Sequence, residues 1–210
     1  MSRILIIAEH DGASLNISTA KCVTCAQAIG GEIDIAVIGN GVDSIAGEAA
    51  SLDAVTRVIA INADHLAAPL AVNWAAEVVN LSSDYTHLLG PSTTFGRDLM
   101  PRVAALCGVN QISDIMEVNG AESFKRPVYA GNAIVQAEPA SGAKTVGTVR
   151  TASWKAAESS GSASVEQAAA SSSPAAHTRY VGLASEGGGR PDLQSAPKVV
   201  SGGRALASEE

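Results

Sequence analysis

The sequence has 210 residues, 46% of them hydrophobic, which is enough to bury the core of one sizeable α/β domain with something smaller attached. A formal net charge of −7, only 14 Lys and Arg residues and 3% aromatic residues argue against a nucleic-acid-binding surface. The apolar run from Ile4 to Ala8 is far shorter than the ~20 residues that a membrane span requires, so we expect no transmembrane helix.

The first residues and the cysteines indicate the compartment. Met1-Ser2-Arg3 leads directly into a strand pattern, without the features of a signal or transit peptide. Three cysteines, an odd number, do not suggest a disulfide framework. We therefore expect a cytoplasmic protein in reducing surroundings.

Three strand patterns, each followed by a helix pattern, open the chain. Apolar runs of strand length cover residues 3–9, 33–38 and 57–61, and helical patterns cover residues 14–29, 42–52 and 69–81. Trp74 falls on the apolar side of the third helix, where a core position is expected rather than a cofactor platform. This alternation predicts right-handed crossovers and a doubly wound parallel sheet.

The segment from Thr86 to Asp114 compresses a strand, a polar loop, a helix and the next strand into one run. The strand stops at Gly90-Pro91, and we expect Asp98 to cap the helix, with Pro101 in its first turn and Gly108 at its end. A P-loop is rejected, because five residues separate Gly90 from Gly96 and Arg97 stands where Lys is needed.

Loops at the carboxyl ends of parallel strands line the crevice where ligands or partners dock. We therefore expect the loop over residues 91–97 and His10 to share one edge of the sheet and to form a partner surface more than an active site. A loop that only turns the chain and caps the helix is the simpler interpretation of the same residues.

After Asn110 strand patterns no longer alternate with helix patterns. The strand patterns cover residues 112–118, 123–130, 133–137 and 145–150, and no helix pattern lies between them. The predicted fold is thus α/β, with a doubly wound, mostly parallel sheet and a mixed or antiparallel strand extension. Residues 151–173 are rich in Ser, Ala and Gly and are expected to form a solvated connector, with an edge strand over 180–183. The glycines and proline of 187–191 predict a boundary between a domain over residues 1–190 and the start of another over 191–210.

Few residue patterns point to chemistry. Cys22 and Cys25 match C-x-x-C but lie within one helical pattern, so we expect reduced, buried or half-buried side chains that bind no metal. His10 is expected to cap or turn the chain, with an acid–base role as the alternative. The other histidines show no metal-ligand spacing, and Gly39-Asn40-Gly41 lacks the third glycine of a dinucleotide fingerprint.

A strand pattern that begins at Lys198 runs into Ser201, Gly202, Gly203 and Arg204, whose backbone N–H groups and guanidinium could hold an anion. Ser208-Glu209-Glu210 then has the pattern of a helix start, and the sequence ends there, so we expect a C-terminally truncated chain.

The ordered motifs together carry a family resemblance. IIAEHDG, HLLGPSTTFGRDLMPRVAALCGVNQISDI, FKRPVYAGNAIV, TVRTASW and RPDLQSAPKVVSGGR resemble the alpha subunit of electron transfer flavoprotein. The family implies a heterodimer in which an N-terminal α/β domain packs on a beta subunit, and a C-terminal domain binds FAD. It implies an electron carrier, without bond-making chemistry of its own, between acyl-CoA and other flavin dehydrogenases and a quinone reductase.

By this resemblance Arg204 contacts FAD, and Ser201, Gly202 and Gly203 shape its turn. The family continues that turn with Gly and then SGENF, whereas Ala205 and Ser208-Glu209-Glu210 stand here, and the later flavin-binding loops have no counterpart. We therefore expect the chain not to retain FAD by itself. Two alternatives stay open: a cofactor-free interaction module, and a nucleotide-binding domain of the adenine-nucleotide hydrolase-like type.

Overall fold

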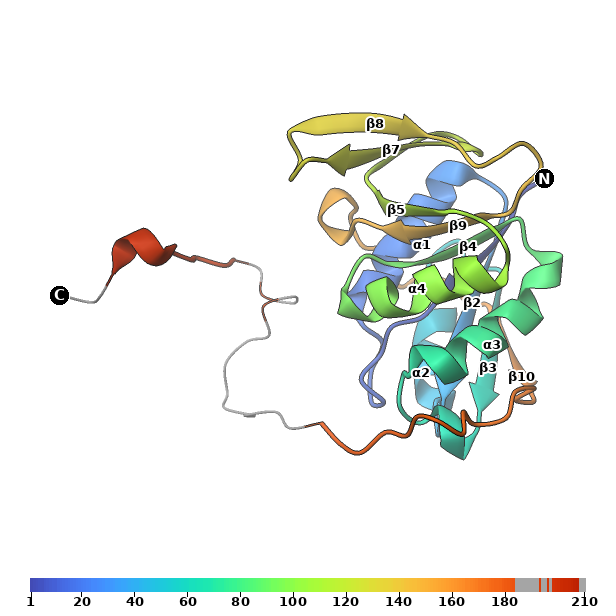
Figure 1. Ribbon diagram of the computed structural model, residues 1–210. Helices are drawn as coiled ribbons and strands as arrows, with labels where there is room; N and C mark the ends of the chain where they lie inside the picture. The colour runs from blue at the N-terminus through green and yellow to red at the C-terminus, as the bar shows by residue number, and fades with distance from the viewer. Residues whose placement is uncertain (184–192, 194–195, 197, 208–210) are drawn as a thin grey trace. The chain divides into compact units, whose positions relative to one another are not determined.

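The computed structural model describes residues 1–183, 193, 196 and 198–207 (Figure 1). The chain divides into two compact units, Met1–Tyr180 and Val181–Glu210. The first unit holds two sheets and the four α-helices that the described residues form. The boundary predicted at residues 187–191 falls outside the described residues, so it stays a prediction.

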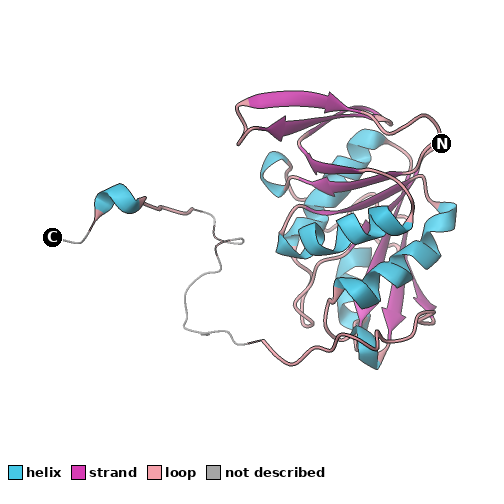
Figure 2. Ribbon diagram, in the orientation of Figure 1, coloured by secondary structure: helices cyan, strands magenta, loops and turns pink. Residues whose placement is uncertain are grey.

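A seven-stranded parallel sheet forms the centre of the first unit (Figure 2). The strand order β10-β3-β2-β1-β4-β9-β5 reverses direction between β1 and β4, as in doubly wound folds. The strands are β1 Arg3–Ile7, β2 Glu32–Gly39, β3 Arg57–Asn62, β4 His87–Pro91, β5 Gln111–Ile115, β9 Thr145–Val149 and β10 Ser164–Ala168.

Helices cover both faces of this sheet. Alternate residues of β1 enter separate cores, because Ile4 and Ile6 pack with α1 and α2, while Leu5 and Ile7 pack with α3 and α4. Strands buried on both faces read as continuous apolar runs, which is why their positions were predictable. The helices are α1 Ile17–Ile29, α2 Asp43–Ala50, α3 Ala71–Leu81 and α4 Thr94–Leu106.

The cysteines and Trp74 lie where the patterns predicted. Cys22 and Cys25 are free thiols, fully buried on α1, and burial raises the pKa of both well above the usual thiol range. Trp74 is 1% exposed, and its indole Nε1 donates a hydrogen bond to the carbonyl of Leu66 at 3.0 Å. All three side chains are therefore core residues.

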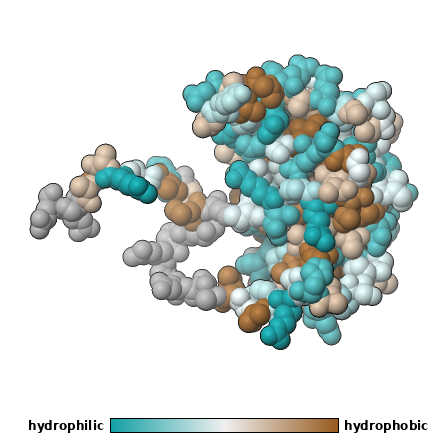
Figure 3. Space-filling view, viewed as in Figure 1, coloured by the Kyte–Doolittle hydropathy of each residue, from teal (hydrophilic) through white to brown (hydrophobic). Residues whose placement is uncertain are grey.

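The strand-rich segment after Asn110 is divided between two sheets. β6 Glu117–Gly120, β7 Ser123–Val128 and β8 Ala133–Ala137 form the expected antiparallel extension. In contrast, β5 and β9 join the parallel sheet, which the sequence prediction had not separated from the extension. Apolar side chains show over the β7–β8 hairpin in Figure 3, and Ile134 of β8 is 56% exposed.

The edge strand was predicted in the wrong place. Residues 180–183 have no strand, whereas β10 lies within the segment expected to be a solvated connector and pairs in parallel with β3. All but the last of its residues are exposed, so it lacks the apolar pattern by which a strand is found.

The chain then crosses α3, where the buried carboxylate of Glu77 holds it. The backbone N–H and hydroxyl groups of Ser171 and Ser172 all donate hydrogen bonds to Glu77. Asn73 accepts another from the N–H of Ala175 at 3.0 Å. The connector is therefore fastened to the domain as far as residue 175.

The start of α4 also differs from the prediction. Thr93, not Asp98, is the N-cap, and its hydroxyl accepts from the N–H of Gly96 at 3.5 Å. Pro101 accordingly lies inside the helix rather than in its first turn, where it cannot donate to the carbonyl four residues earlier. Among the described residues, no helix is both long enough and apolar enough to cross a membrane.

Candidate functional site

The carboxyl ends of β1 and β4 meet at the point where the strand order reverses, the usual place for a ligand in such a sheet. The segment after β1 contains Glu9 and His10, and the loop after β4 contains Ser92 and Thr93. The prediction that His10 and the 91–97 loop share one edge of the sheet is therefore confirmed.

Glu9 fills the position between the N-termini of α1 and α4. Its Oε2 accepts from the Ser18 hydroxyl at 2.6 Å and from the Thr93 hydroxyl at 3.0 Å. Ser18 lies in the first turn of α1, and Thr93 is the N-cap of α4. Helix N-termini favour negative charge, so the protein's own carboxylate stands where a nucleotide phosphate would bind in related folds.

His10 has both ring nitrogens engaged in local contacts. Its Nε2 lies 2.8 Å from the carbonyl of Ile38, and its Nδ1 accepts from the N–H of Gly12 at 3.1 Å. The ring centroid is 5.6 Å from that of Trp74, which in turn makes an edge contact with Phe95. His10 therefore turns the chain and connects it to α3 and α4, which confirms the simpler of its two expected roles.

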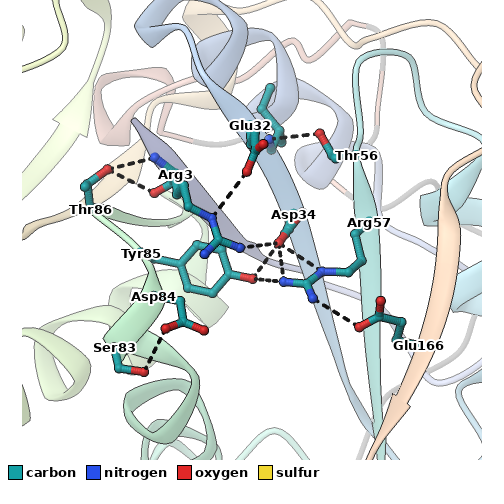
Figure 4. A network of polar contacts seen from close by, with 11 residues as sticks. Arg3, Glu32, Asp34, Thr56, Arg57, Ser83, Asp84, Tyr85, Thr86 and Glu166 are labelled. Atoms are coloured by element: carbon teal, nitrogen blue, oxygen red, sulfur yellow. Dashed lines mark hydrogen bonds and ion pairs between the residues drawn. The ribbon is translucent and has the colours of Figure 1, made fainter. Parts of the chain in front are cut away.

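The opposite edge of the sheet has a charged network centred on Asp34 of β2 (Figure 4). Its Oδ2 accepts from Arg57 Nη2 at 2.7 Å and from the Tyr85 hydroxyl at 2.6 Å, and Asp34 is 3% exposed. The hydrogen bond with Asp34 raises the pKa of Arg57, while burial and then Asp34 raise the pKa of Tyr85. Arg57 also pairs with Glu166, so the network ties β10 to the sheet.

The predicted cofactor residues lie in the second unit. Ser201, Gly202, Gly203 and Arg204 are all exposed, and Arg204 begins a short 3-10 helix, Arg204–Leu206. A side chain at position 202 would collide with Leu206, since a Cβ there would lie 1.9 Å from its Cδ1. Leu206 is exposed, however, and its flexible side chain could rotate away from a Cβ at position 202. The expected helix start at Ser208-Glu209-Glu210 lies outside the described residues.

Comparison with known proteins decides the family. Residues 4–173 match the model of the electron transfer flavoprotein domain. The chain belongs to the electron transfer flavoprotein family. This confirms the resemblance drawn from the ordered motifs and accounts for nearly all of the first structural unit.

The chain's relatives in this family are named as alpha subunits. It is 42% identical over 204 residues to electron transfer flavoprotein subunit alpha of Pseudomonas aeruginosa, covering 97% of the chain and 65% of that protein. It is 39% identical to the subunit of Paracoccus denitrificans, covering 99% and 67%, and 35% identical to the mitochondrial subunit of Arabidopsis thaliana, covering 98% and 61%. The chain thus spans about two thirds of the length of these relatives.

Sequence reasoning missed the role of Glu9. The residue was present in the motif that ends β1, but nothing in the order of residues showed that Thr93 would reach it from 84 positions away. A carboxylate directly after a buried strand and before a capped helix was the available signal. In a doubly wound sheet this position lies in the crevice outside the carboxyl ends of the strands, beside the helices that follow them.

Proposed function

We propose that this chain acts as the alpha-type subunit of an electron transfer flavoprotein. In that role it would pair with a beta subunit and carry electrons from acyl-CoA and other flavin dehydrogenases to a quinone reductase. The identity to alpha subunits over nearly the whole chain supports this proposal. The three free cysteines agree with a reducing compartment, and we propose the cytoplasm.

The nucleotide-binding alternative is not favoured. A phosphate at the reversal point of the sheet would meet the carboxylate of Glu9, which already accepts hydrogen bonds from Ser18 and Thr93. The family match likewise does not favour a cofactor-free module of another kind. We therefore propose an electron carrier that performs no bond-making chemistry of its own.

The described residues fit one contact to FAD rather than a whole flavin site. The exposed Arg204 guanidinium and the Ser201-Gly202-Gly203 turn offer hydrogen-bond donors to a polar or anionic group of the cofactor. FAD, when bound in the assembled protein, would supply the redox chemistry, and Arg204 would hold and orient it. All four residues of the turn are exposed, so the turn by itself does not enclose the cofactor.

We expect the isolated chain not to retain FAD. Micromolar binding requires about −8 kcal/mol, whereas an exposed charged contact contributes about 1 kcal/mol or less. The test is calorimetric titration of FAD into the purified chain, with absorbance at the flavin bands as a second readout. Submicromolar binding by the chain alone would contradict this prediction and reveal a flavin site elsewhere in it.

Subunit pairing is tested separately from FAD binding. We propose that the carboxyl edge of the sheet contacts the beta subunit, since Thr94 and Arg97 in the first turn of α4 are exposed there, and the carboxylate of Glu9 occupies the anion position beside them. Thr94→Arg should weaken binding of a beta subunit at least tenfold in analytical ultracentrifugation. Ser83→Arg, at an exposed position near the amino end of β4, is the control and should bind as the unchanged chain does. Equal loss in both variants would place the interface elsewhere.

A further inference from the structure

A cavity of about 380 Å³ lies at the carboxyl ends of β4, β9 and β5, apart from the Glu9 position. We call it the arginine cavity, and the side chains that matter for its chemistry are those of Ser92, Arg97, Gln111, Asp114, Arg126 and Thr148. They come from α4 and its preceding loop, from β5, β7 and β9, so the parallel sheet and the antiparallel extension build it together. Its size falls within the range of small-molecule pockets.

Positive charge exceeds negative charge at this cavity. Arg97 Nη2 lies 4.0 Å from Asp114 Oδ1, and Arg150 Nη1 lies 3.9 Å from Asp114 Oδ2, so both pairs are at the limit of contact. Arg126 uses its Nε to donate to the carbonyl of Ser113 at 2.7 Å. Within the described part of the chain, Arg126 has no carboxylate within 4.0 Å. The lining therefore has two guanidinium groups, those of Arg97 and Arg126, and one carboxylate, that of Asp114, in a protein whose net charge is −7.

The backbone beside the cavity is held in an uncommon conformation. Asp114 has φ +62°, and the pairing of β5 with β9 shifts register between Ile112 and Ile115. The N–H of Asp114 donates to the hydroxyl of Thr148 at 2.9 Å, which fixes the bulge. Bulges and left-handed residues of this kind occur often beside binding sites, where they redirect a side chain.

Gln111 adds a polar group without a partner. Its Nε2 donates to the hydroxyl of Ser113 at 3.0 Å, but its Oε1 is buried without a hydrogen-bond partner among the described residues. Exchanging the two ends of the amide would leave the Nε2 unpaired instead. Only in the exchanged setting could an anion in the cavity remove this cost, because the Nε2 would donate to it, whereas Oε1 and the anion are both acceptors.

We propose that the arginine cavity binds a small molecule through an oxyanion, either a phosphate or a carboxylate. Arg97 and Arg126 would donate to the oxyanion from two sides, and the hydroxyls of Ser92 and Thr148 would complete the polar lining. Asp114 would lower the affinity for the ligand, because its negative charge repels an anion. Its contacts with Arg97 and Arg150 would at the same time hold those two side chains nearby.

The experiment is a titration of the ¹⁵N-labelled chain with sodium phosphate, followed by backbone amide shifts in two-dimensional NMR. Sodium chloride at matched ionic strength is the reference, and sodium succinate in a parallel titration distinguishes a carboxylate from a phosphate ligand. Saturable shifts centred on residues 92–97 and 111–114 are expected with at least one of the two anions. Shifts that do not saturate, or that chloride reproduces, would overturn the proposal.

Variants test the charges directly. Arg97→Gln and Arg126→Gln should each lower the affinity for the anion about tenfold, since each removes one charged donor. Arg102→Gln is the matched control, because Arg102 lies exposed on the same helix as Arg97 and does not line the cavity. Asp114→Asn should instead tighten binding, and asparagine tolerates the positive φ at that position. Unchanged affinity in both arginine variants, or weaker binding in Asp114→Asn, would refute the assigned geometry.

Discussion

Asp34 has the largest expected effect of any single residue on the amino edge of the sheet. Asp34→Asn would replace the carboxylate that Arg57 and Tyr85 share with a neutral amide, and removing the charge of one partner of a buried ion pair is strongly destabilising. We expect a loss of about 3 kcal/mol in the free energy of unfolding, measured by urea denaturation. Asp84→Asn, at an exposed position of the same region, should change it by less than about 0.5 kcal/mol. Similar values for both would show that the network contributes little.

Ionisation of Glu77 makes the free energy of unfolding depend on pH. Burial alone would raise the pKa of Glu77, but the hydrogen bonds from Ser172 and Ser171 outweigh it and lower the pKa below 4.5. A carboxylate whose pKa is depressed by folding stabilises the fold above its unfolded pKa, and this stabilisation is lost as pH falls through the folded pKa. We expect Glu77→Gln to unfold in less urea than the unchanged chain at pH 7, with the difference shrinking below pH 4.5.

The matched control for Glu77 is Glu158→Gln, because Glu158 is exposed. That variant should follow the urea and pH dependence of the unchanged chain. A difference between Glu77→Gln and the unchanged chain that is the same at pH 7 and well below pH 4.5 would show that the serine contacts do not depend on the ionised carboxylate.

At the scale of elements, the start of α4 can be tested by a pair of substitutions. Thr93→Ala removes the N-cap and the hydroxyl that donates to Glu9, and should cost about 1 to 2 kcal/mol of stability in thermal or urea unfolding. Asp98→Ala, at the exposed position first expected to cap the helix, should be close to neutral. The reverse order of effects would restore Asp98 as the cap.

Gly96 fixes how closely α4 approaches β4. A Cβ at position 96 would lie 1.8 Å from the carbonyl oxygen of Pro91, and this backbone atom cannot move aside as a side chain can. Gly96→Ala should therefore destabilise the domain by several kcal/mol, although alanine favours helices elsewhere. Gly47→Ala, in α2 with open space around its Cβ, should be neutral or stabilising. Circular dichroism melts of the two variants make the comparison, and similar melting temperatures would contradict the clash.

At the scale of the whole molecule, the features that could be predicted from the sequence are those that local hydrophobic periodicity determines. The four βα units, the parallel sheet and the buried positions of Cys22, Cys25 and Trp74 were all read from apolar spacing. The order of strands across the sheet was not predicted. β9 lies between β4 and β5 in space, although residues 92–144, which include the whole antiparallel sheet, separate it from β4 in the chain.

The arginine cavity and the Glu9 contact were beyond sequence reasoning for the same reason. Arg97, Asp114 and Arg126 are adjacent only after β5 and β7 have taken their places, and no spacing in the chain records that proximity. β10 was not predicted, because it has no apolar pattern of its own. It is held in the sheet by its pairing with β3.

The placement of β10 has a consequence for how the chain is made. Asn62 of β3 and Gln167 of β10 are hydrogen-bonded although they are 105 positions apart. A ribosome adding roughly 5 to 20 residues per second leaves the outer edge of β3 unpaired for about 5 to 20 seconds after it emerges. During that interval the nascent chain presents an apolar strand edge to its neighbours. Slow translation of the segment before β10 should therefore favour aggregation during synthesis more than slow translation after it.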